Sequence, residues 1–454
     1  MVAVGTKVRV VQRLCSAIVR NPFASPLWRN GPFRRVWAAS TVSVFGSLVT
    51  RIALPLVAIL VLGAGAVEMA LLRSLDLVAA LVFGLVAGAW VDRLRRRPVL
   101  IWADLGRAVL LGSIPVAFAL GILTFPHLLI VTGVAAVLTV FFDAADNAYL
   151  PSIVEREQLT DANAALSASG SASEVLAFGL GGFLVQLLSA PVTIAIDAVT
   201  FLVSAVLLGT IRKEEPPPPP PADRSPVIAE IRDGVRLVRH DPILRAFLGA
   251  QISISLVWGI FGTTWWLFTV DELGLGAAAL GVVAAVGGLS SLAGALITGP
   301  ATRRWGVGTV VLAALVFSTV AHVFVPLAPV GAPIVALTLL ILAQLVGDSA
   351  LTAYDISEVV VRQTLVEDRA LGRVSSTFVV ASGIAQLITT LLAGALAVSI
   401  GLRTTMWIAP VFGVVGILII WFSPVRRLRE LPVRLDAGTV EAVEDVDRDR
   451  PIGA

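Results

Sequence analysis

Cysteine and histidine are nearly absent from this sequence. Its 454 residues contain one cysteine, Cys15, and three histidines. A single cysteine excludes an internal disulfide framework and a cysteine-based metal site. The histidines, His127, His240 and His322, stand too far apart in the chain to indicate a shared metal site. We therefore expect no metal ion and no cofactor.

The motifs that would indicate an enzyme or an ATP-driven pump are missing too. No Gly-Lys dipeptide occurs, which excludes a P-loop and therefore ATP-driven transport by this chain. Neither G-x-S-x-G nor H-E-x-x-H is present. The sequence thus gives no support for an enzyme, and we expect no nucleic-acid partner.

Charged residues are scarce as well. They make up 14% of the chain and hydrophobic residues 57%, whereas a soluble domain usually carries about 25% charged residues. Apolar runs of about 20 residues, long enough to cross a hydrocarbon core as a helix, recur along almost the whole chain. The alternation of polar and apolar residues that is typical of membrane β-barrels does not dominate. The sequence predicts a polytopic α-helical membrane protein in the bilayer of a cell membrane.

Twelve apolar segments have the length of a membrane-spanning helix, and short connections join them. We predict spans at 36–62, 69–91, 98–123, 127–150, 162–188, 191–211, 243–270, 277–301, 308–327, 332–357, 374–400 and 402–422. Several of these runs exceed the minimum length, so the helices are expected to tilt in the membrane.

Basic residues occur in alternate connections. They gather before span one, in the loops after spans two, eight and ten, in the insert after span six, and after span twelve. The intervening loops contain almost none, Arg403 being the exception. Basic loops stay in the cytoplasm, so we expect both termini to be cytoplasmic.

The longest polar insert separates two groups of six spans. It contains six consecutive prolines, 216–221, and such a run forms an extended, semi-rigid linker. We divide the chain into a basic N-terminal segment (1–35), an N-terminal six-helix bundle (36–211), a cytoplasmic linker (212–242), a C-terminal six-helix bundle (243–422) and a cytoplasmic tail (423–454).

The two halves resemble each other in sequence. A shift of 212 residues places Val154 on Val366 and Glu155 on Glu367. The same shift places two acidic residues near the end of span four on two near the end of span ten. Parallel six-helix repeats with a site near the membrane midplane between them are a transporter architecture. We therefore expect two pseudo-symmetric bundles.

The loop after span two carries a recognisable pattern, G-x-x-x-D-R-x-x-R-R. Its residues are Gly88, Asp92, Arg93, Arg96 and Arg97. Together with twelve spans and the duplication, it resembles the loop signature of the major facilitator superfamily, over about residues 33–432. The resemblance implies the major facilitator fold. The segments FFDAADNAYLPSIV and RQTLVEDRALGRVSS resemble a branch of bacterial exporters that includes enterobactin-exporter-like and macrolide-efflux-like proteins.

Two positions depart from the family pattern. The second copy of the loop has Arg303 where the aspartate would stand. The antiporter motif of the fifth helix has a Gly-Pro pair, and here Phe178 replaces the proline. Gly179, Gly181 and Gly182 still permit close helix packing. The missing proline weakens the case for antiport without removing it.

Three ionisable residues inside spans are candidates for proton coupling. They are Arg51 on span one, Asp76 on span two and Glu174 on span five. Ionisable side chains inside a membrane are costly and usually face a cavity or a partner. The alternative is a structural ion pair that never exchanges a proton. We interpret a further pair, Asp104 and Arg107 on span three, as structural, because their spacing favours a contact on one helix face.

A second group of charges suggests a gate on the cytoplasmic side. Asp143 and Asp146 lie near the cytoplasmic end of span four, and their repeats Asp355 and Glu358 lie near that of span ten. The arginine-rich loops lie on the same side, so ion pairs between acids and arginines would form in one state and break in the other. The family resemblance implies that Asp92 acts with them. The arginines alone are also explained as a topology signal.

Polar and aromatic residues on span seven suggest a substrate wall. Gln251, Ser255, Trp258 and Trp265 recur at helical spacing on one face. Trp265 alternatively belongs to the aromatic belt at the membrane surface. Gln344 and Asp348 form a similar stripe on span ten. Such a surface suits a bulky, mostly apolar ligand.

The sequence therefore predicts a monomeric secondary transporter that works by alternating access. We expect export of an amphiphilic or drug-like small molecule, such as an antibiotic, siderophore or secondary metabolite, in exchange for protons. A uniporter or importer of the same fold is one alternative. A membrane sensor or scaffold without transport is another, but a scaffold would not need paired acidic and basic elements in both halves.

Overall fold

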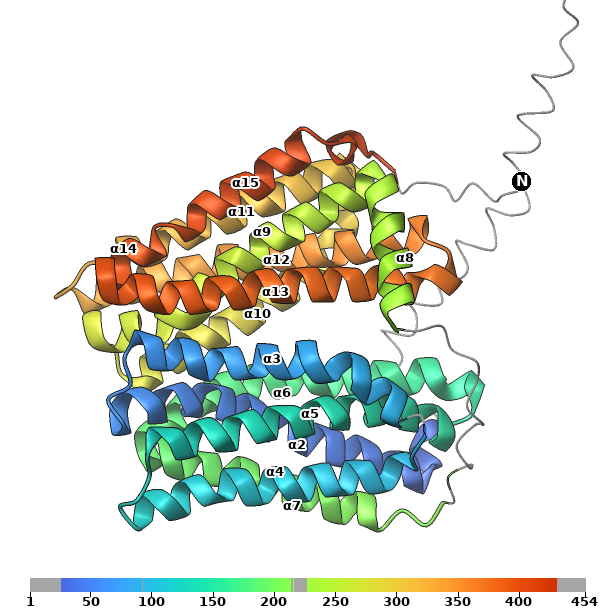
Figure 1. Ribbon diagram of the computed structural model, residues 1–454, viewed down its shortest axis with the longest axis vertical. Coiled ribbons are helices and arrows are strands. Elements are labelled where there is room, and N and C mark those ends of the chain that lie inside the picture. Colours follow the sequence, from blue (N-terminus) through green and yellow to red (C-terminus); the bar gives the residue numbers. More distant parts are fainter. Residues whose placement is uncertain (1–25, 92, 214, 216–226, 431–454) are drawn as a thin grey trace, which may run out of the picture.

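The computed structural model describes residues 26–91, 93–213, 215 and 227–430. Every regular element of these residues is a helix, and the helices form two bundles that lie side by side (Figure 1). One side of the molecule carries the first and last described residues and the linker helix α8; we call it the terminus side. The opposite side is the distal side. The all-α polytopic fold predicted from the sequence is confirmed.

The N-terminal bundle contains the helices of the first half. They are α2 (Gly31–Leu56), α3 (Ala66–Val91), α4 (Arg96–Ala119), α5 (Phe125–Ile153), α6 (Leu159–Leu188) and α7 (Ala190–Gly209). Short 3-10 helices at Pro26–Arg29 and Arg156–Gln158 precede α2 and α6.

The C-terminal bundle repeats this order. Its helices are α9 (Pro242–Leu267), α10 (Ala277–Trp305), α11 (Val307–Leu327), α12 (Pro333–Leu365), α13 (Asp368–Ile400), and the pair α14 (Leu402–Met406) and α15 (Ala409–Trp421). A 3-10 turn, Pro424–Arg427, follows. Within the described residues, eleven helical segments are long and apolar enough to cross a membrane. The 26-residue α3 occupies the remaining place in the repeat.

Both bundles begin in the same way. Asn30 caps α2 by accepting a hydrogen bond from the amide of Phe33 at 3.2 Å. Asp241 caps α9 by accepting from the amides of Ile243 and Leu244 at 2.7 and 3.0 Å. Each cap is followed by a proline in the first turn, where its fixed φ favours the helix.

Both first helices also end in the same way. A π-helical turn, Val57–Val61, ends the first span, and Phe268–Glu272 ends its repeat. Each turn runs into a Leu-Gly-x-Gly-Ala segment whose first glycine has a positive φ, 64° at Gly63 and 65° at Gly274. An L-residue would be strained there. The duplication inferred from sequence thus extends to backbone conformation.

The hydrophobic core shows how the two bundles meet. On the distal side one continuous core contains residues of both halves, for example Ile52 and Leu72 with Phe261 and Leu280. Towards the terminus side there are two separate cores. One lies within the N-terminal bundle around Phe33, and the other lies within the C-terminal bundle. The bundles are therefore joined at the distal side and separate towards the termini.

Glycines bring the bundles close together on the distal side. Gly182 of α6 lies against the backbone of Gly281 and Ala277 of α10. Gly394 of α13 lies against the start of α3 at Ala70. These contacts agree with the close packing expected around Gly182.

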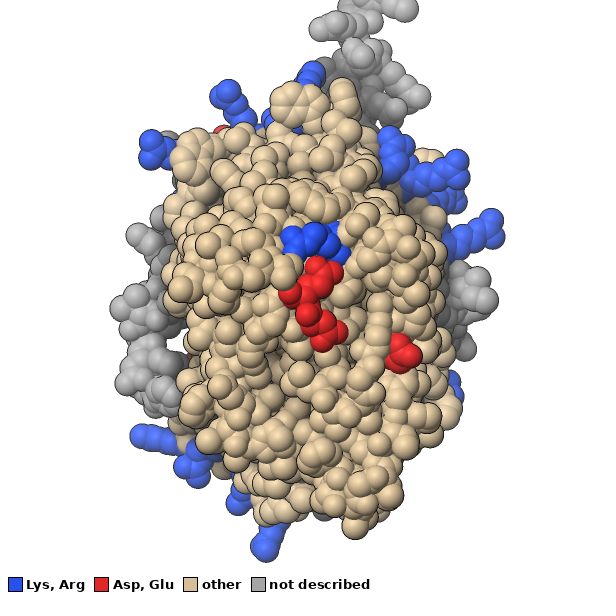
Figure 2. Space-filling view, turned by 90° about the vertical axis from the view of Figure 1, so that its left-hand side faces the viewer, with Lys and Arg blue, Asp and Glu red and all other residues tan. Residues whose placement is uncertain are grey.

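Charges are distributed unequally between the two sides. The distal face is almost entirely uncharged across its middle, apart from a small group of basic and acidic side chains and one separate acidic side chain (Figure 2). Arg403 belongs to this side. It donates to the carbonyls of Pro326 and Ala328 at 2.8 Å and lies 3.4 Å from Glu272. Arg403, the arginine that departs from the alternate basic loops, thus caps the end of α11.

The linker is fixed to both bundles where it is described. Glu215 accepts hydrogen bonds from the amides of Arg96 and Arg97, at 2.8 and 3.2 Å, and so caps α4. Helix α8 (Val227–His240) packs on α13, where Asp233 lies 3.0 Å from Arg373. The polyproline run lies outside the described residues.

Candidate functional site

Three ionisable side chains of the N-terminal bundle form one group at the boundary with the other bundle. On α3, Arg73 Nη1 lies 3.8 Å from Asp76 Oδ2. Arg51 of α2 is close enough to act electrostatically on both. A Cβ on Gly262 of α9 would lie 3.5 Å from Arg73 Nε, so Arg73 reaches the C-terminal bundle. Sequence reasoning missed Arg73, although its i, i+3 spacing from Asp76 was a usable signal.

Glu174 is placed in a different group, with a residue of the other half. Helix α6 packs against α10, where Val175 contacts Gly288. The side chain of Asp348 on α12 lies against the adjacent Gly287. Glu174 acts electrostatically on Asp348. The candidate coupling residue Glu174 and the candidate substrate residue Asp348 therefore face the same region between the bundles.

The amide side chain of Gln344 completes this region. It lies one turn from Asp348 on α12, and both side chains would contact a Cβ on Gly287. Among the described residues, no ion pair involves Glu174 or Asp348. Two acids and an amide from both halves thus lie in one region, and neither acid has an ion-pair partner among the described residues.

The candidate residues of span seven separate into two sets on α9. The ring of Trp258 lies 6.2 Å from that of His322 on α11 and lines a pocket between α9, α11 and α15. The ring of Trp265 packs edge-on against Trp266, 4.8 Å away. Ser255 is buried, and Gln251 is half-buried. The structure therefore does not gather all four side chains into one surface.

The arginine-rich loop contacts the ends of neighbouring helices. Arg97 donates to the carbonyls of Leu208 and Gly209, at 2.9 and 2.5 Å, at the end of α7. Arg96 lies 3.3 Å from Glu215, whose side chain is 5% exposed. Arg93 is exposed, and Gly88 has open space around its α-carbon. Asp92 lies outside the described residues.

The four acids of the predicted gate have other neighbours. Glu358 lies 3.4 Å from Arg362 on its own helix. Asp143 and Asp146 are close enough to Arg107 to act on it electrostatically, and Asp355 is exposed. Within the part of the chain that is described, no ion pair joins these acids to the loop arginines. Between the described acids and arginines of the predicted gate, no ion pair is therefore formed in this conformation.

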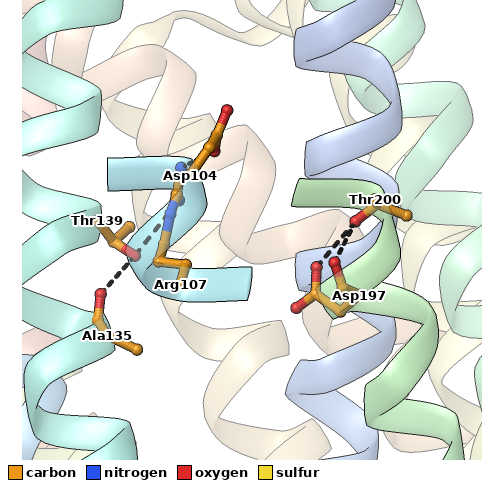
Figure 3. Close-up of polar contacts among 6 residues, drawn as sticks. All are labelled: Asp104, Arg107, Ala135, Thr139, Asp197 and Thr200. Carbon is orange, nitrogen blue, oxygen red and sulfur yellow. Dashed lines mark hydrogen bonds and ion pairs between the residues drawn. The ribbon is translucent and has the colours of Figure 1, made fainter. Parts of the chain in front are cut away.

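A third group is buried inside the N-terminal bundle. Arg107 donates to Asp104 at 2.6 Å and contacts Thr139 at 3.5 Å (Figure 3). The guanidinium also contacts two aromatic rings: Arg107 Cζ lies 4.2 Å from the ring centre of Phe142 and 4.1 Å from that of Phe201. The Asp104–Arg107 contact agrees with the local pair inferred from their spacing.

Asp197 of α7 belongs to the same buried group, and sequence reasoning missed it. Its side chain is 1% exposed. Thr200 donates to its carboxyl at 3.1 Å, beside α2 and apart from the Arg107 contact (Figure 3). Both side chains lie against Gly46 of α2, where a Cβ would collide with them. An aspartate in the middle of an apolar span was the signal that could have identified it.

Comparison with known proteins places this architecture in a family. The family model described as Major Facilitator Superfamily matches residues 36–354 and 250–451. The uncharacterized MFS-type transporter YfiS of Bacillus subtilis (strain 168) is 24% identical over 83% of this chain and 89% of its own length. The multidrug efflux pump Tap of Mycolicibacterium fortuitum is 27% identical over 48% of this chain and 54% of its own length. Macrolide efflux protein A of Streptococcus pyogenes is 26% identical over 48% of this chain and 53% of its own length.

Solved structures share the fold. A bacterial homologue of the iron transporter ferroportin, in an inward-facing state, superposes with a TM-score of 0.69 at 18% identity, over 87% of this chain and 99% of that one. The nucleoside transporter NupG gives a TM-score of 0.68 at 14% identity, over 86% of this chain and 98% of that one. At such identities the likeness describes the fold alone.

Proposed function

The chain belongs to the major facilitator superfamily, and from this premise we propose that it is a secondary exporter that exchanges an amphiphilic small molecule for protons by alternating access. Its family and fold are those of membrane transporters and not of enzymes. It is a multi-pass membrane protein.

The arrangement of the hydrophobic core carries the proposal of alternating access. One core joins the halves on the distal side, while each half keeps its own core towards the termini. A transporter that alternates between two openings must be able to join its halves on either side in turn. The gate acids and the loop arginines, which form no ion pair with one another among the described residues, are available to form the complementary closure.

Charges between the bundles support proton exchange. The Arg51–Arg73–Asp76 group and the Glu174–Asp348 group lie where the two halves face one another. A carboxyl that is alternately near to and far from a cation binds and releases a proton as the halves move. Ionisable side chains in the membrane interior are functional candidates for this reason.

The direction and the kind of substrate rest on similarity. The names of two relatives describe efflux of multiple drugs and of macrolides. The candidate substrate residues Gln344 and Asp348 offer hydrogen-bonding groups beside a largely apolar interface. An uptake carrier is the second candidate, since NupG is a nucleoside transporter of the same fold.

The orientation in the membrane follows from charge. Arginines are concentrated on the terminus side, while the distal face is nearly uncharged (Figure 2). By the positive-inside rule the terminus side is cytoplasmic. The conformation then opens towards the cytoplasm.

Efflux from intact cells tests the proposal. Cells with and without the protein are loaded with a panel of fluorescent cationic, neutral and anionic amphiphiles, and retention is followed with and without a proton uncoupler. We expect faster loss of some compounds in cells carrying the protein, and we expect the uncoupler to abolish the difference. Faster accumulation would favour the importer, and loss that the uncoupler leaves unchanged would favour a uniporter.

A further inference from the structure

The repeat allows the buried charges of one half to be compared with the same place in the other. Helices α2, α4 and α7 correspond to α9, α11 and the α14–α15 pair, with a shift of 211 or 212 residues. Burial follows the same shift: buried Leu100 and Ala103 on α4 correspond to buried Val311 and Ala314 on α11. The equivalence is therefore defined residue by residue.

At this place the two halves differ in charge. Asp104 corresponds to Leu315, Arg107 to Ser318 and Asp197 to Ala409. All three counterparts in the C-terminal half are uncharged, and all are buried. They line the pocket between α9, α11 and α15, so the charged group of one half corresponds to uncharged, partly unfilled space in the other.

This contrast argues against a purely structural role for the charges. At this pocket the contact among these three helices forms in the C-terminal half without an ion pair among the described residues, and the titratable side chain there is that of His322. Burying an ion pair costs desolvation energy, and apolar residues of similar size are often as stable or more so. A charged network retained in only one half therefore points to function.

The network also contains more acids than cations. Arg107 contacts Asp104 on α4, and Asp143 of α5 acts on it electrostatically. Asp197 is a further acid. Towards it, α4 contributes Arg107 and Asp104 at electrostatic range, and α2 contributes the Thr50 hydroxyl and the bare backbone of Gly46. No ion pair to Asp197 occurs among the described residues, and a buried carboxyl without a contacting cation favours its neutral, protonated form.

We propose that Asp197 is a proton-binding residue of the transport cycle and that Arg107 controls its release. In this conformation Asp197 holds a proton, and the hydroxyl of Thr200 donates to its carboxyl. Arg107 Nε has no hydrogen-bond partner among the described residues. A shift of α7 towards α4 would let Nε–H bind Asp197 while Arg107 keeps Asp104. The carboxylate then forms, and the proton leaves.

The position of α2 links this site to the boundary between the bundles. Thr50 stands beside Asp197, and the next residue, Arg51, acts on the Arg73–Asp76 group. A movement of α2 that follows substrate binding therefore changes both environments at once. This inference rests on the proton exchange proposed above, but it assigns the proton to Asp197 instead of Asp76 or Glu174.

Two measurements test the assignment. Infrared difference spectra of the purified protein in lipid report protonated carboxyl groups directly, whether or not a substrate is known. We expect a carboxylic acid C=O band in the wild type at neutral pH that disappears in Asp197→Asn. The matched control is Glu157→Gln, which removes an exposed acid of the same half and should leave the band in place. A band that persists in Asp197→Asn overturns the assignment.

Substrate-driven proton movement in proteoliposomes is the second measurement, with a fluorescent compound that the efflux assay identifies. We expect Asp197→Asn to carry that compound downhill but to lose proton movement. A triple variant, Asp104→Leu, Arg107→Met and Asp197→Ala, imitates the uncharged half and should fold, carry the compound and move no protons. Unchanged proton movement in either variant refutes the role of Asp197. A wild type that carries the compound without protons would instead refute the proposed proton exchange.

Discussion

Gly182 is the position at which one added methyl group should shift the conformational equilibrium. A Cβ there would lie 2.7 Å from the α-carbon and 2.8 Å from the amide nitrogen of Gly281, and nearer still to the Ala277 carbonyl. These atoms belong to the backbone of α10 and cannot rotate away. Contact distances of about 3.5–4.0 Å are optimal for carbon atoms, so α6 and α10 would have to separate by roughly 1 Å.

The added methyl group destabilises only the conformation in which α6 and α10 are in contact. Overpacking of a close contact costs about 1–3 kcal/mol, and Gly182→Ala should impose it only while the distal side is closed. A bias of that size changes the ratio of two states by about 5–150-fold. We therefore expect Gly182→Ala to populate a state in which the distal side is open and the terminus side is closed.

Spin-label distances across the distal side provide the assay. With Cys15 replaced by serine, labels at Val192 and Val330, which are exposed on opposite bundles, should report a longer distance in Gly182→Ala. Gly170→Ala is the matched control, because it lies on the same helix with open space around it. Both substitutions gain about 1 kcal/mol of helix propensity. A distance distribution in Gly182→Ala that matches the wild type would refute the reasoning.

Three further predictions concern the linker, the distal cap and the orientation. Glu215→Ala removes the acceptor that caps α4 and should lower the free energy of unfolding by about 1–2 kcal/mol, with Glu215→Gln losing less; equal thermal stability of all three proteins in detergent would contradict the cap. A lysine in place of Arg403 cannot reach the carbonyls of Pro326 and Ala328 and also Glu272. Arg403→Lys should therefore lower the free energy of unfolding by about 1–3 kcal/mol, whereas Arg303→Lys, at an exposed position, should change it little in the same denaturation assay. In a Cys15→Ser background, His240→Cys should react with a membrane-impermeant thiol reagent only after the cells are opened and Val330→Cys in intact cells, and the reverse pattern would overturn the orientation.

The fold could be predicted from sequence because it depends on local properties. Span length, apolar composition and alternate basic loops are each properties of single segments, and they define twelve helices without knowledge of contacts. The repeat adds the pairing of halves. Even so, the last span is broken between α14 and α15, just before Pro410, where the missing amide and the ring of proline disfavour a continuous helix.

The grouping of the charges could not be predicted in the same way. Depth along a helix does not determine which face a side chain occupies, so Glu174 was grouped with Arg51 although it lies near Asp348. The capping of α4 by Glu215 joins residues 119 positions apart and leaves no periodic signal. Asp197 was passed over because its partners, Thr50 and Thr200, are ordinary residues of apolar helices.

The internal repeat separates what the fold requires from what transport requires. Features present in both halves, such as the helix caps at Asn30 and Asp241 and the π-helical turns before Gly63 and Gly274, meet needs that any such bundle has. Features present in one half cannot be explained by that shared need. The Asp104–Arg107–Asp197 network is of the second kind, because its counterpart packs without charge. A transporter built from two similar bundles can place its proton site in one half and keep the other uncharged, since coupling needs only one group whose environment changes as the halves move.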